Sequence, residues 1–177
     1  ESLAGTSVPR DFVELPSQIM ENWAAEPEVM KMYAKHYKTS EVIPDALIEK
    51  MEKAGTFDQG FITTEYLAAS LLDMEYHSQK AAIKSNAETF EKQAMDKIGL
   101  PSSIIPRYRS TYFNHIFAGG YSAGYYSYIW SGVLDTDAFD VFKTNGLFNQ
   151  KDANSFRKNI LEKGGTQEPM ELYKAFR

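Results

Sequence analysis

Apolar side chains recur at every third or fourth position along most of the chain, which is the spacing that places them on one face of an α-helix. The first such stripe is formed by Phe12, Leu15, Ile19 and Trp23. Alternation with a period of two, which would indicate β-strands, is almost absent. The pattern therefore predicts an all-α fold made of many helices.

Residues that start and stop helices divide this pattern into segments. Asp11 is predicted as the N-cap of the first helix, residues 85–88 (SNAE) as a capping box, and Asn149 as the cap of a late helix that ends at residues 164–165. Further helices are expected at residues 26–37, 44–55, 61–80, 121–142 and 169–177, with a loop at 100–109. Because no repeat or long linker interrupts the pattern, residues 1–177 are expected to form a single helical unit.

The composition is that of an ordinary globular protein. Of the 177 residues, 43% are hydrophobic and 24% are charged, proportions that exclude collagen and disordered chains. No apolar run approaches the ~20 residues of a membrane-spanning helix, so no membrane partner is expected. The net charge of −5 argues against nucleic acid, because binding phosphates needs clustered Lys and Arg. The absence of cysteine excludes disulfides, thiolate nucleophiles and cysteine-bound zinc.

Both ends of the sequence are unusual for a complete protein. The chain begins with Glu1 rather than methionine, and it stops inside the helix expected at residues 169–177. We therefore expect it to be a piece of a longer polypeptide.

A cluster of tyrosines is the first candidate site. Tyr121, Tyr125 and Tyr128 are spaced by four and three residues, so they share one face of the expected helix. One interpretation is an aromatic packing stripe with its hydroxyls at the surface. The other is a row of hydroxyl donors along a cleft, able to stabilise an oxyanion. Gly119 and Gly120 precede the row, either as a simple turn or as part of a loop that closes over a ligand.

Other polar residues give weaker signals. His115 lies four residues before Gly119, and a lone histidine is more often structural than catalytic. Glu14 lies off the apolar stripe, where a solvated helix face is the simpler interpretation. Asp73 and His77 share a helix face, and a hydrogen-bonded pair is a simpler interpretation than a metal site, because one carboxylate and one imidazole are too few ligands.

Two long motifs change this picture. Residues 8–18 (VPRDFVELPSQ) and 115–130 (HIFAGGYSAGYYSYIW) closely resemble signatures of the thimet oligopeptidase, neurolysin and peptidyl-dipeptidase family of zinc metallopeptidases. Residues 71–77 (LLDMEYH) and 107–113 (RYRSTYF) are most similar to the bacterial peptidyl-dipeptidase branch, and the tail at 164–177 also fits. The resemblance covers essentially the whole chain. It implies the multi-helical C-terminal part of a zincin-type catalytic domain.

The resemblance implies a zinc ion held by two histidines and a downstream glutamate. In the family, the histidines and a general-base glutamate come from a His-Glu-x-x-His helix, and the motif match places the third ligand on Glu14. This sequence has no such motif, since none of His36, His77 and His115 has a second histidine four residues away. The helix is therefore expected upstream of Glu1. This chain would supply one zinc ligand of three, lack the base, and be inactive alone.

The resemblance also implies roles for other residues in peptide hydrolysis by zinc-activated water. Tyr128 is implied as the donor to the tetrahedral oxyanion, and His115 as a hydrogen-bond partner of the substrate near the scissile bond. Tyr121 and Tyr125 are implied to line the same groove, and Arg10 aligns with a position near the substrate.

The mode of cleavage stays open at this point. The predicted function is release of C-terminal dipeptides from short peptides; the alternatives are an endo-acting oligopeptidase of the same family and a helical binding module without chemistry. Arg107 or Arg109 is a candidate to grip the substrate carboxylate through a bidentate contact. We expect a cytoplasmic protein, with the periplasm as the alternative compartment.

Overall fold

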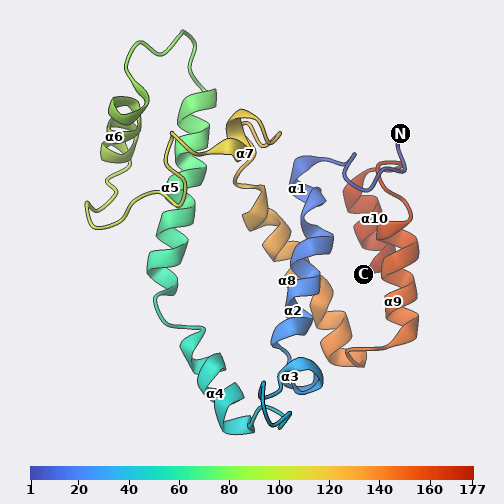
Figure 1. The fold of residues 1–177 in the computed structure, drawn as a ribbon. Helices are drawn as coiled ribbons and strands as arrows, with labels where there is room; N and C mark the ends of the chain where they lie inside the picture. The colour runs from blue at the N-terminus through green and yellow to red at the C-terminus, as the bar shows by residue number, and fades with distance from the viewer. The chain divides into compact units, whose positions relative to one another are not determined.

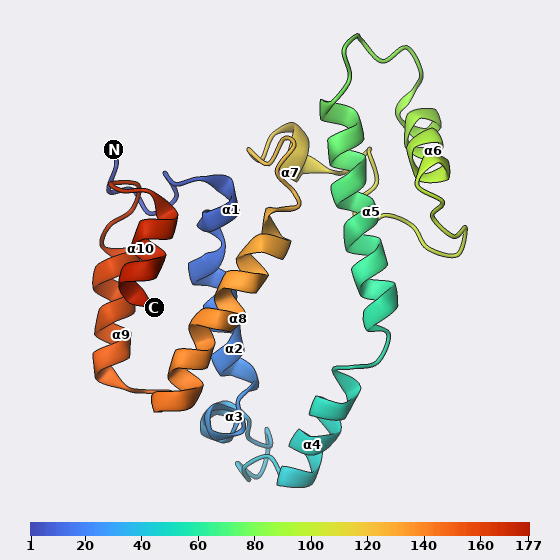
Figure 2. The same ribbon diagram turned by 180° about the vertical axis from the view of Figure 1, so that it is seen from behind.

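A computed structural model describes residues 1–177. The chain is helical, and its one pairing of extended backbone is an isolated antiparallel bridge between Lys35 and Val42 (Figures 1 and 2). The elements in chain order are α1 (Arg10–Val13), α2 (Leu15–Ala25), α3 (Pro27–Tyr33), α4 (Asp45–Ala54), α5 (Gln59–His77), α6 (Ala87–Lys97), α7 (Asn114–Phe117), α8 (Ser127–Asn145), α9 (Gln150–Phe156), the π-helical turn η1 (Arg157–Leu161) and α10 (Pro169–Phe176). The all-α prediction is confirmed. None of these helices combines the length and the apolar character that crossing a bilayer requires.

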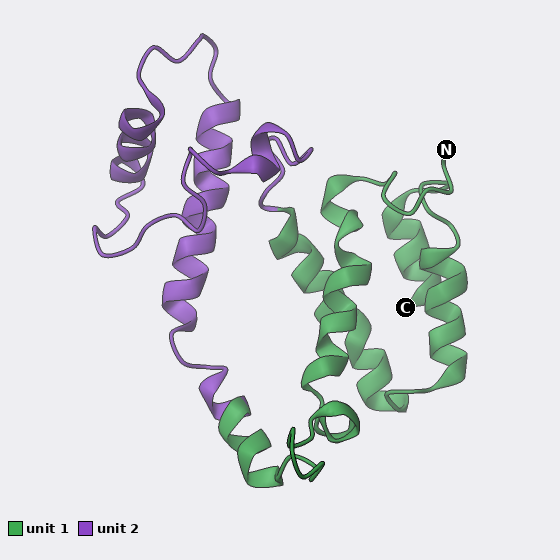
Figure 3. Ribbon diagram, viewed as in Figure 1, with its two compact units in different colours: residues 1–51, 127–177 green, residues 52–126 purple.

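The chain divides into two compact units, each of which is described by itself. Unit 1 combines residues 1–51 with residues 127–177, and unit 2 consists of residues 52–126 (Figure 3). Unit 1 is therefore discontinuous in sequence. That residues 1–177 work as a single helical unit stays a prediction.

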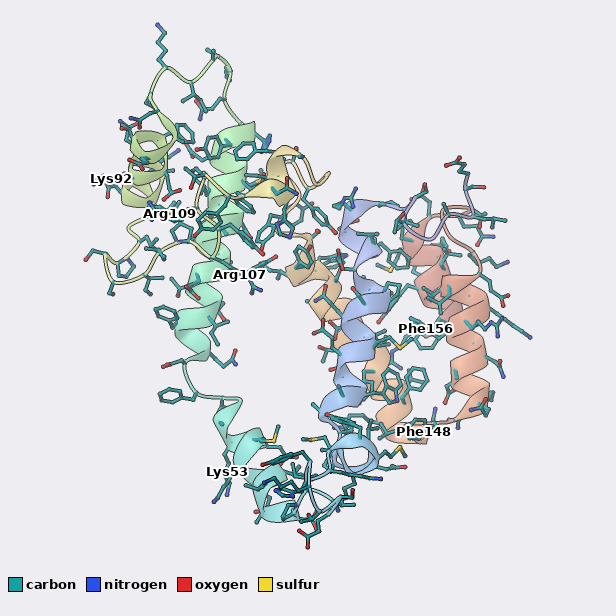
Figure 4. All side chains as sticks on the ribbon, in the orientation of Figure 1. Lys53, Lys92, Arg107, Arg109, Phe148 and Phe156 are labelled. Atoms are coloured by element: carbon teal, nitrogen blue, oxygen red, sulfur yellow. The ribbon has the colours of Figure 1, made fainter.

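The core of unit 1 forms where α2 lies along α8, with α9 and α10 beside them (Figures 1 and 2). Trp23 closes one edge of this core: its ring lies 4.6 Å from that of Phe139, and its Nε1 donates to the backbone oxygen of Leu147 at 2.9 Å. Phe156 is buried in the core whereas Phe148 is exposed (Figure 4). The predicted stripe of α1 and α2 is confirmed as a buried face. The core residues are Phe12, Leu15, Ile19, Leu134, Ala138, Phe139, Phe142, Phe156, Ile160, Leu172, Tyr173 and Phe176.

The first helix begins two residues earlier than the sequence predicts. Pro9 is the N-cap, with φ −50° and ψ 142°, and its carbonyl accepts from the backbone N–H groups of Phe12 and Val13. Asp11 lies inside α1, and no side chain caps the helix. The prediction of Asp11 as N-cap is therefore wrong. Pro9 already supplies the extended backbone at which the helix starts, so Arg10 is helical.

The late helix of unit 1 starts as predicted. The side chain of Asn149 accepts hydrogen bonds from the backbone N–H groups of Lys151 and Asp152, at 2.9 and 3.3 Å. This satisfies donors that the first turn of α9 leaves without helical partners. The same helix continues into the wider π-helical turn η1, which the sequence pattern does not reveal.

Two glycines after η1 allow the N-terminal segment to approach closely. A Cβ atom on Gly165 would lie 2.3 Å from the backbone oxygen of Ser7, and one on Gly164 would lie 2.6 Å from that of Ser2. Gly165 also donates its N–H to the oxygen of Ser2 at 2.6 Å. Larger residues at these two positions would displace the start of the chain from the turn before α10.

Unit 2 is built on α5, with α6 packed beside it (Figures 1 and 2). The start of α6 differs from the prediction, because its cap is Asn86, whose side-chain oxygen accepts from the N–H of Thr89 at 2.8 Å. The capping box at residues 85–88 is therefore wrong by one position. The predicted end is confirmed, since Gly99 follows the last turn with φ +70°.

Candidate functional site

Glu14 lies in unit 1 at the junction of α1 and α2. It has φ −90° and ψ −5°, and it is both the C-cap of α1 and the N-cap of α2. The hydroxyl of Ser17 donates to this residue, with its Oγ 2.7 Å from Oε2 of the carboxylate and 3.0 Å from the backbone oxygen. Glu14 is partly buried. Its carboxylate is thus oriented at a break between helices rather than on a continuous solvated face.

Tyr128 lies in the first turn of α8, which is also part of unit 1. Its backbone oxygen accepts a hydrogen bond from Nε2 of Gln18 at 3.2 Å. Gln18 is one helical turn beyond Glu14 on α2. Unit 1 therefore places the predicted zinc ligand and the predicted oxyanion donor on two directly packed helices.

A buried carboxylate reinforces the contact between α2 and α8. Asp135 on α8 is 7% exposed, and its two oxygens accept from Nδ2 of Asn22 at 3.1 Å and from Nε2 of Gln18 at 3.5 Å. Sequence reasoning missed this cluster. The available signal was the spacing of Gln18 and Asn22, which are four residues apart and therefore on one helix face.

The tyrosine row does not form one helical face. Because α8 begins at Ser127, Tyr121 and Tyr125 lie in the loop before it, in unit 2. The carboxylate of Asp73 accepts from the backbone N–H groups of Ala123 and Tyr125, each at 2.9 Å. These N–H groups are thereby withdrawn from helical bonding, and Ala123 takes a left-handed φ of 54°. The predicted helix at residues 121–142 is wrong over its first six positions.

Tyr125 is enclosed by other aromatic rings of unit 2. It is 3% exposed, and its ring centroid lies 4.9 Å from that of Phe113, 5.3 Å from that of Tyr66 and 5.5 Å from that of His115. Burial raises the pKa of the Tyr125 phenol well above its ordinary value, and Arg107 opposes the rise. The phenol is therefore neutral at physiological pH.

His115 and Tyr121 lie close together at the two ends of one tight turn. The N–H of Tyr121 donates to the backbone oxygen of His115 at 2.9 Å, and the two rings are 6.1 Å apart. A Cβ atom on Gly119 would lie 2.8 Å from Cα of His115, so only glycine fits at that position. The glycines before the tyrosines thus serve the turn that joins these two candidate residues.

The candidate arginines differ in their surroundings. Arg109 donates from Nε to Glu91, a buried carboxylate that also accepts from the N–H and the hydroxyl of Ser110 at 2.7 and 2.8 Å. The side chain of Arg107 is exposed (Figure 4). Arg10 belongs to α1 in unit 1.

Nδ1 of His77 hydrogen-bonds the backbone oxygen of Asp73 at 2.9 Å and lies 2.7 Å from Oδ1 of its carboxylate. This is the hydrogen-bonded pair that the sequence favoured over a metal site. The sequence placed Asp73 beside His77 on one helix, but it gave no sign that the same carboxylate also binds the backbone N–H groups of Ala123 and Tyr125.

The chain offers one candidate ligand for a zinc ion. Its residues contain no group of three or more histidine, cysteine, aspartate and glutamate side chains that is able to hold a metal. The carboxylate of Glu14 is a ligand type that zinc accepts, and the hydroxyl of Ser17 orients it. Glu14 thus fits the part of a single ligand in a site completed by other groups.

The sequence profile described as Peptidase family M3 matches residues 1–177. The chain belongs to peptidase family M3. It is 43% identical to the dipeptidyl carboxypeptidase of Salmonella typhimurium over 99% of its length, which is 26% of that protein. It is 42% identical to the oligopeptidase A of Escherichia coli over 97% of its length, 25% of that protein, and 33% identical to the saccharolysin of Saccharomyces cerevisiae over 96%, 24% of that protein.

These findings confirm the family that the two long motifs indicated. The M3 chain spans about a quarter of the length of the curated relatives it matches. Its match nevertheless runs through every helix described above.

Proposed function

We propose that this M3 chain is part of a zinc-dependent peptidyl-dipeptidase, which hydrolyses short peptides and releases dipeptides from their C-termini. The observation that carries the proposal is the 43% identity to a dipeptidyl carboxypeptidase over nearly the whole chain. The oriented carboxylate of Glu14 and the direct contact of its helix with the first turn of α8 support it.

The zinc ligand of this chain is Glu14 in this proposal. Zinc, when bound, supplies a Lewis acid and an activated water. Ser17 holds the Glu14 carboxylate, and the hydroxyl of Tyr128 donates to the oxygen that gains charge as the peptide bond is attacked. A neutral phenol performs this task without bringing a charge of its own into the site.

Residues of unit 2 bind the peptide in this proposal. His115 hydrogen-bonds the substrate near the scissile bond, and Tyr121 and Tyr125 line the groove. Arg107 and Arg109 are the two candidates for the substrate carboxylate. The exposed guanidinium of Arg107 favours it, because Glu91 already engages Nε of Arg109. Arg10 is the further candidate for substrate contact.

The remaining zinc ligands and the general base come from the same polypeptide upstream of Glu1, so the 177 residues alone neither hold zinc tightly nor cleave peptides. The protein acts in the cytoplasm, with the periplasm as the alternative. A second candidate function is endo-acting cleavage. The 42% identity to oligopeptidase A favours it nearly as strongly.

The deciding experiment compares a peptide that has a free C-terminus with its amidated twin, using the full-length enzyme and mass analysis of the products. A peptidyl-dipeptidase releases dipeptides from the free peptide and leaves the amidated one largely intact. Equal internal cleavage of both peptides would establish the endo-acting alternative. No cleavage of either would reject both.

A matched variant tests the metal site in the same preparation. Glu14→Gln replaces an anionic oxygen ligand by a neutral amide, so zinc content and activity should both fall while far-UV circular dichroism stays helical. Full zinc occupancy with near-normal turnover would remove Glu14 from the ligand set.

A further inference from the structure

The carboxylate of Asp73 is the most enclosed polar group of unit 2. The residue is 0% exposed and lies on α5, which also buries the apolar residues Ala69 and Leu72. Burying a charged group is costly unless it is paired and hydrogen-bonded. The partners of the Asp73 carboxylate therefore indicate its role.

All partners of this carboxylate that come from other elements lie in the loop before α8. Oδ1 accepts from the N–H of Ala123 and Oδ2 from the N–H of Tyr125, each at 2.9 Å. On its own helix, Nδ1 of His77 lies 2.7 Å from Oδ1. One carboxylate thus holds two backbone N–H groups that are two residues apart.

These two hydrogen bonds offset the energetic cost of an unfavourable backbone conformation in the loop. Ala123 has φ 54°, in the left-handed region that a residue with a Cβ atom disfavours. Such conformations persist where the surroundings over-determine them. The bond from the N–H of Ala123 to Asp73 is the contact that fixes it.

A second residue of α5 grips the same loop. The hydroxyl of Tyr66 donates to the backbone oxygen of Tyr125 at 2.6 Å. Tyr125 is therefore held by its N–H and by its carbonyl, both from one rigid helix. Its ring in turn packs against the ring of His115 at 5.5 Å.

Hydrogen bonds also connect this loop to His115 and Ile116. Tyr121 donates to the backbone oxygen of His115 at 2.9 Å, and the hydroxyl of Ser122 donates to that of Ile116 at 2.6 Å. The shape of residues 118–126 thus determines where His115 and Tyr121 point.

We propose that Asp73 is a positioning residue of the peptidase reaction: its buried carboxylate shapes the loop at residues 118–126 so that His115 and Tyr121 meet the peptide at the scissile bond. This inference rests on the proposed function. Asp73 touches no substrate, so its effect passes through the loop.

The test uses the full-length enzyme with Asp73→Asn, in which an amide NH₂ faces one of the two backbone N–H groups. We expect kcat to fall about 10- to 100-fold with KM changed less than about threefold, because small misplacements of catalytic groups cost rates of that order. Zinc content should stay unchanged. Hydrogen exchange of the peptide covering residues 118–126 should speed up in the absence of substrate.

Leu72→Ala is the matched control. Leu72 is fully buried beside Asp73 on α5 and bonds to none of the loop residues. The variant should melt at a lower temperature yet keep kcat and the exchange rate of residues 118–126 when assayed well below that temperature. An equal loss of kcat in both variants would overturn the proposal, because Asp73 would then act through stability alone.

Tyr66→Phe decides the matter if Asp73→Asn does not fold. It keeps the ring and removes the hydroxyl that bonds to Tyr125, and it should lower kcat about three- to tenfold while speeding exchange in the loop. Wild-type kcat and unchanged exchange in the variants would overturn the proposal. Failure of the proposed function is a different result, namely a wild-type enzyme that releases no dipeptides.

Discussion

The side-chain amide of Gln18 donates to the backbone oxygen of Tyr128, 3.2 Å away. This bond fastens α2 to the first turn of α8 one helical turn from Glu14. The same amide approaches Asp135, which Asn22 also binds, so a short polar seam runs along an otherwise apolar contact. Partly buried polar seams of this kind fix how two helices align, because a shifted alignment leaves their groups unpaired.

Gln18→Met should therefore destabilise the protein. The substitution keeps length and bulk but removes the donor to Tyr128 and to the buried Asp135. Losing such hydrogen bonds, one of them to a buried carboxylate, costs about 1–3 kcal/mol. Calorimetric unfolding of the full-length protein at fixed zinc concentration measures the change. Gln59→Met, at an exposed amide that donates to Gly55, should stay within about 0.5 kcal/mol. Equal losses of stability in the two variants would show that the hydrogen bonds of Gln18 contribute nothing specific to the contact between α2 and α8.

Ser17→Ala should weaken zinc binding without removing a ligand. The hydroxyl of Ser17 lies 2.7 Å from Oε2 of Glu14, and losing such an orienting partner typically lowers metal affinity about 10- to 100-fold. Competition with a chromophoric chelator measures this affinity in the full-length enzyme. Ser103→Ala, in an exposed loop, is the control. Identical affinities in the two variants would show that Glu14 needs no support from Ser17.

Tyr128→Phe should lower kcat by roughly 10²–10³, the usual cost of one oxyanion donor, with zinc content retained and KM little changed. Phenylalanine keeps the ring, so packing is nearly preserved. Tyr126→Phe should resemble the wild type, because Tyr126 is exposed in the preceding loop. A Tyr128→Phe enzyme within about threefold of wild-type kcat, which is under ~1 kcal/mol, would exclude Tyr128 from the chemistry.

Asn86→Ala should cost about 1 kcal/mol of stability, the typical value of an N-cap. Asn86 accepts from the N–H of Thr89 at 2.8 Å, whereas Ser85 has no such role. Ser85→Ala should therefore change stability by less than about 0.5 kcal/mol. Urea denaturation of both variants tests the assignment, and the reverse ranking would restore the capping box that the sequence suggested.

The contribution of Asp137 to the stability of the protein should depend on pH. Its carboxylate accepts hydrogen bonds from Arg177 at 2.9 Å and from Tyr173 at 2.7 Å. Both bonds favour the charged carboxylate, that of Arg177 more strongly, and they lower the pKa of Asp137 below the ordinary value of 3.8. A lowered pKa in the folded state means that the stabilisation is present above 3.8 and is lost as the pH falls through the folded value. The difference in melting temperature between wild type and Asp137→Asn should therefore shrink from neutral pH to about pH 3. A constant difference would contradict this linkage.

Local sequence rules predicted the helix boundaries well where the residues that start or end a helix belong to that helix itself. Pro27, Pro44 and Pro169 start or precede helices because a proline costs nothing in the first turn, and Asn149 caps α9 with its own side chain. Such features need no knowledge of the rest of the chain.

The tyrosine row failed for the opposite reason. The spacing of Tyr121, Tyr125 and Tyr128 is helical, but the hydrogen bonds that decide the local backbone come from Asp73, about fifty residues earlier in the chain. No periodic pattern contains that information. The prediction for Asp11 failed for a simpler reason, since Pro9, two residues earlier, already supplies the extended residue before the helix.

The roles of Glu14 and Tyr128 were inferred from motifs rather than from periodicity. Glu14 and Tyr128 are identified by long matching segments, while their support from Ser17 and Gln18 appears only in the folded contacts. Supporting residues such as these are identified by the atoms that they contact, and those contacts cannot be derived from the sequence alone.

The discontinuous sequence of unit 1 has a consequence for synthesis on the ribosome. The apolar stripe at Phe12, Leu15 and Ile19 packs against residues as late as Leu172 and Phe176. At roughly 5–20 residues per second, that stripe emerges on the order of ten seconds before its partners. Residues 52–126 are contiguous, so the whole of unit 2 emerges during the interval. The newborn chain therefore passes through a stage in which all of unit 2 has been synthesised while the apolar helix of unit 1 still lacks its partners, and this exposed helix is then a binding surface for a chaperone.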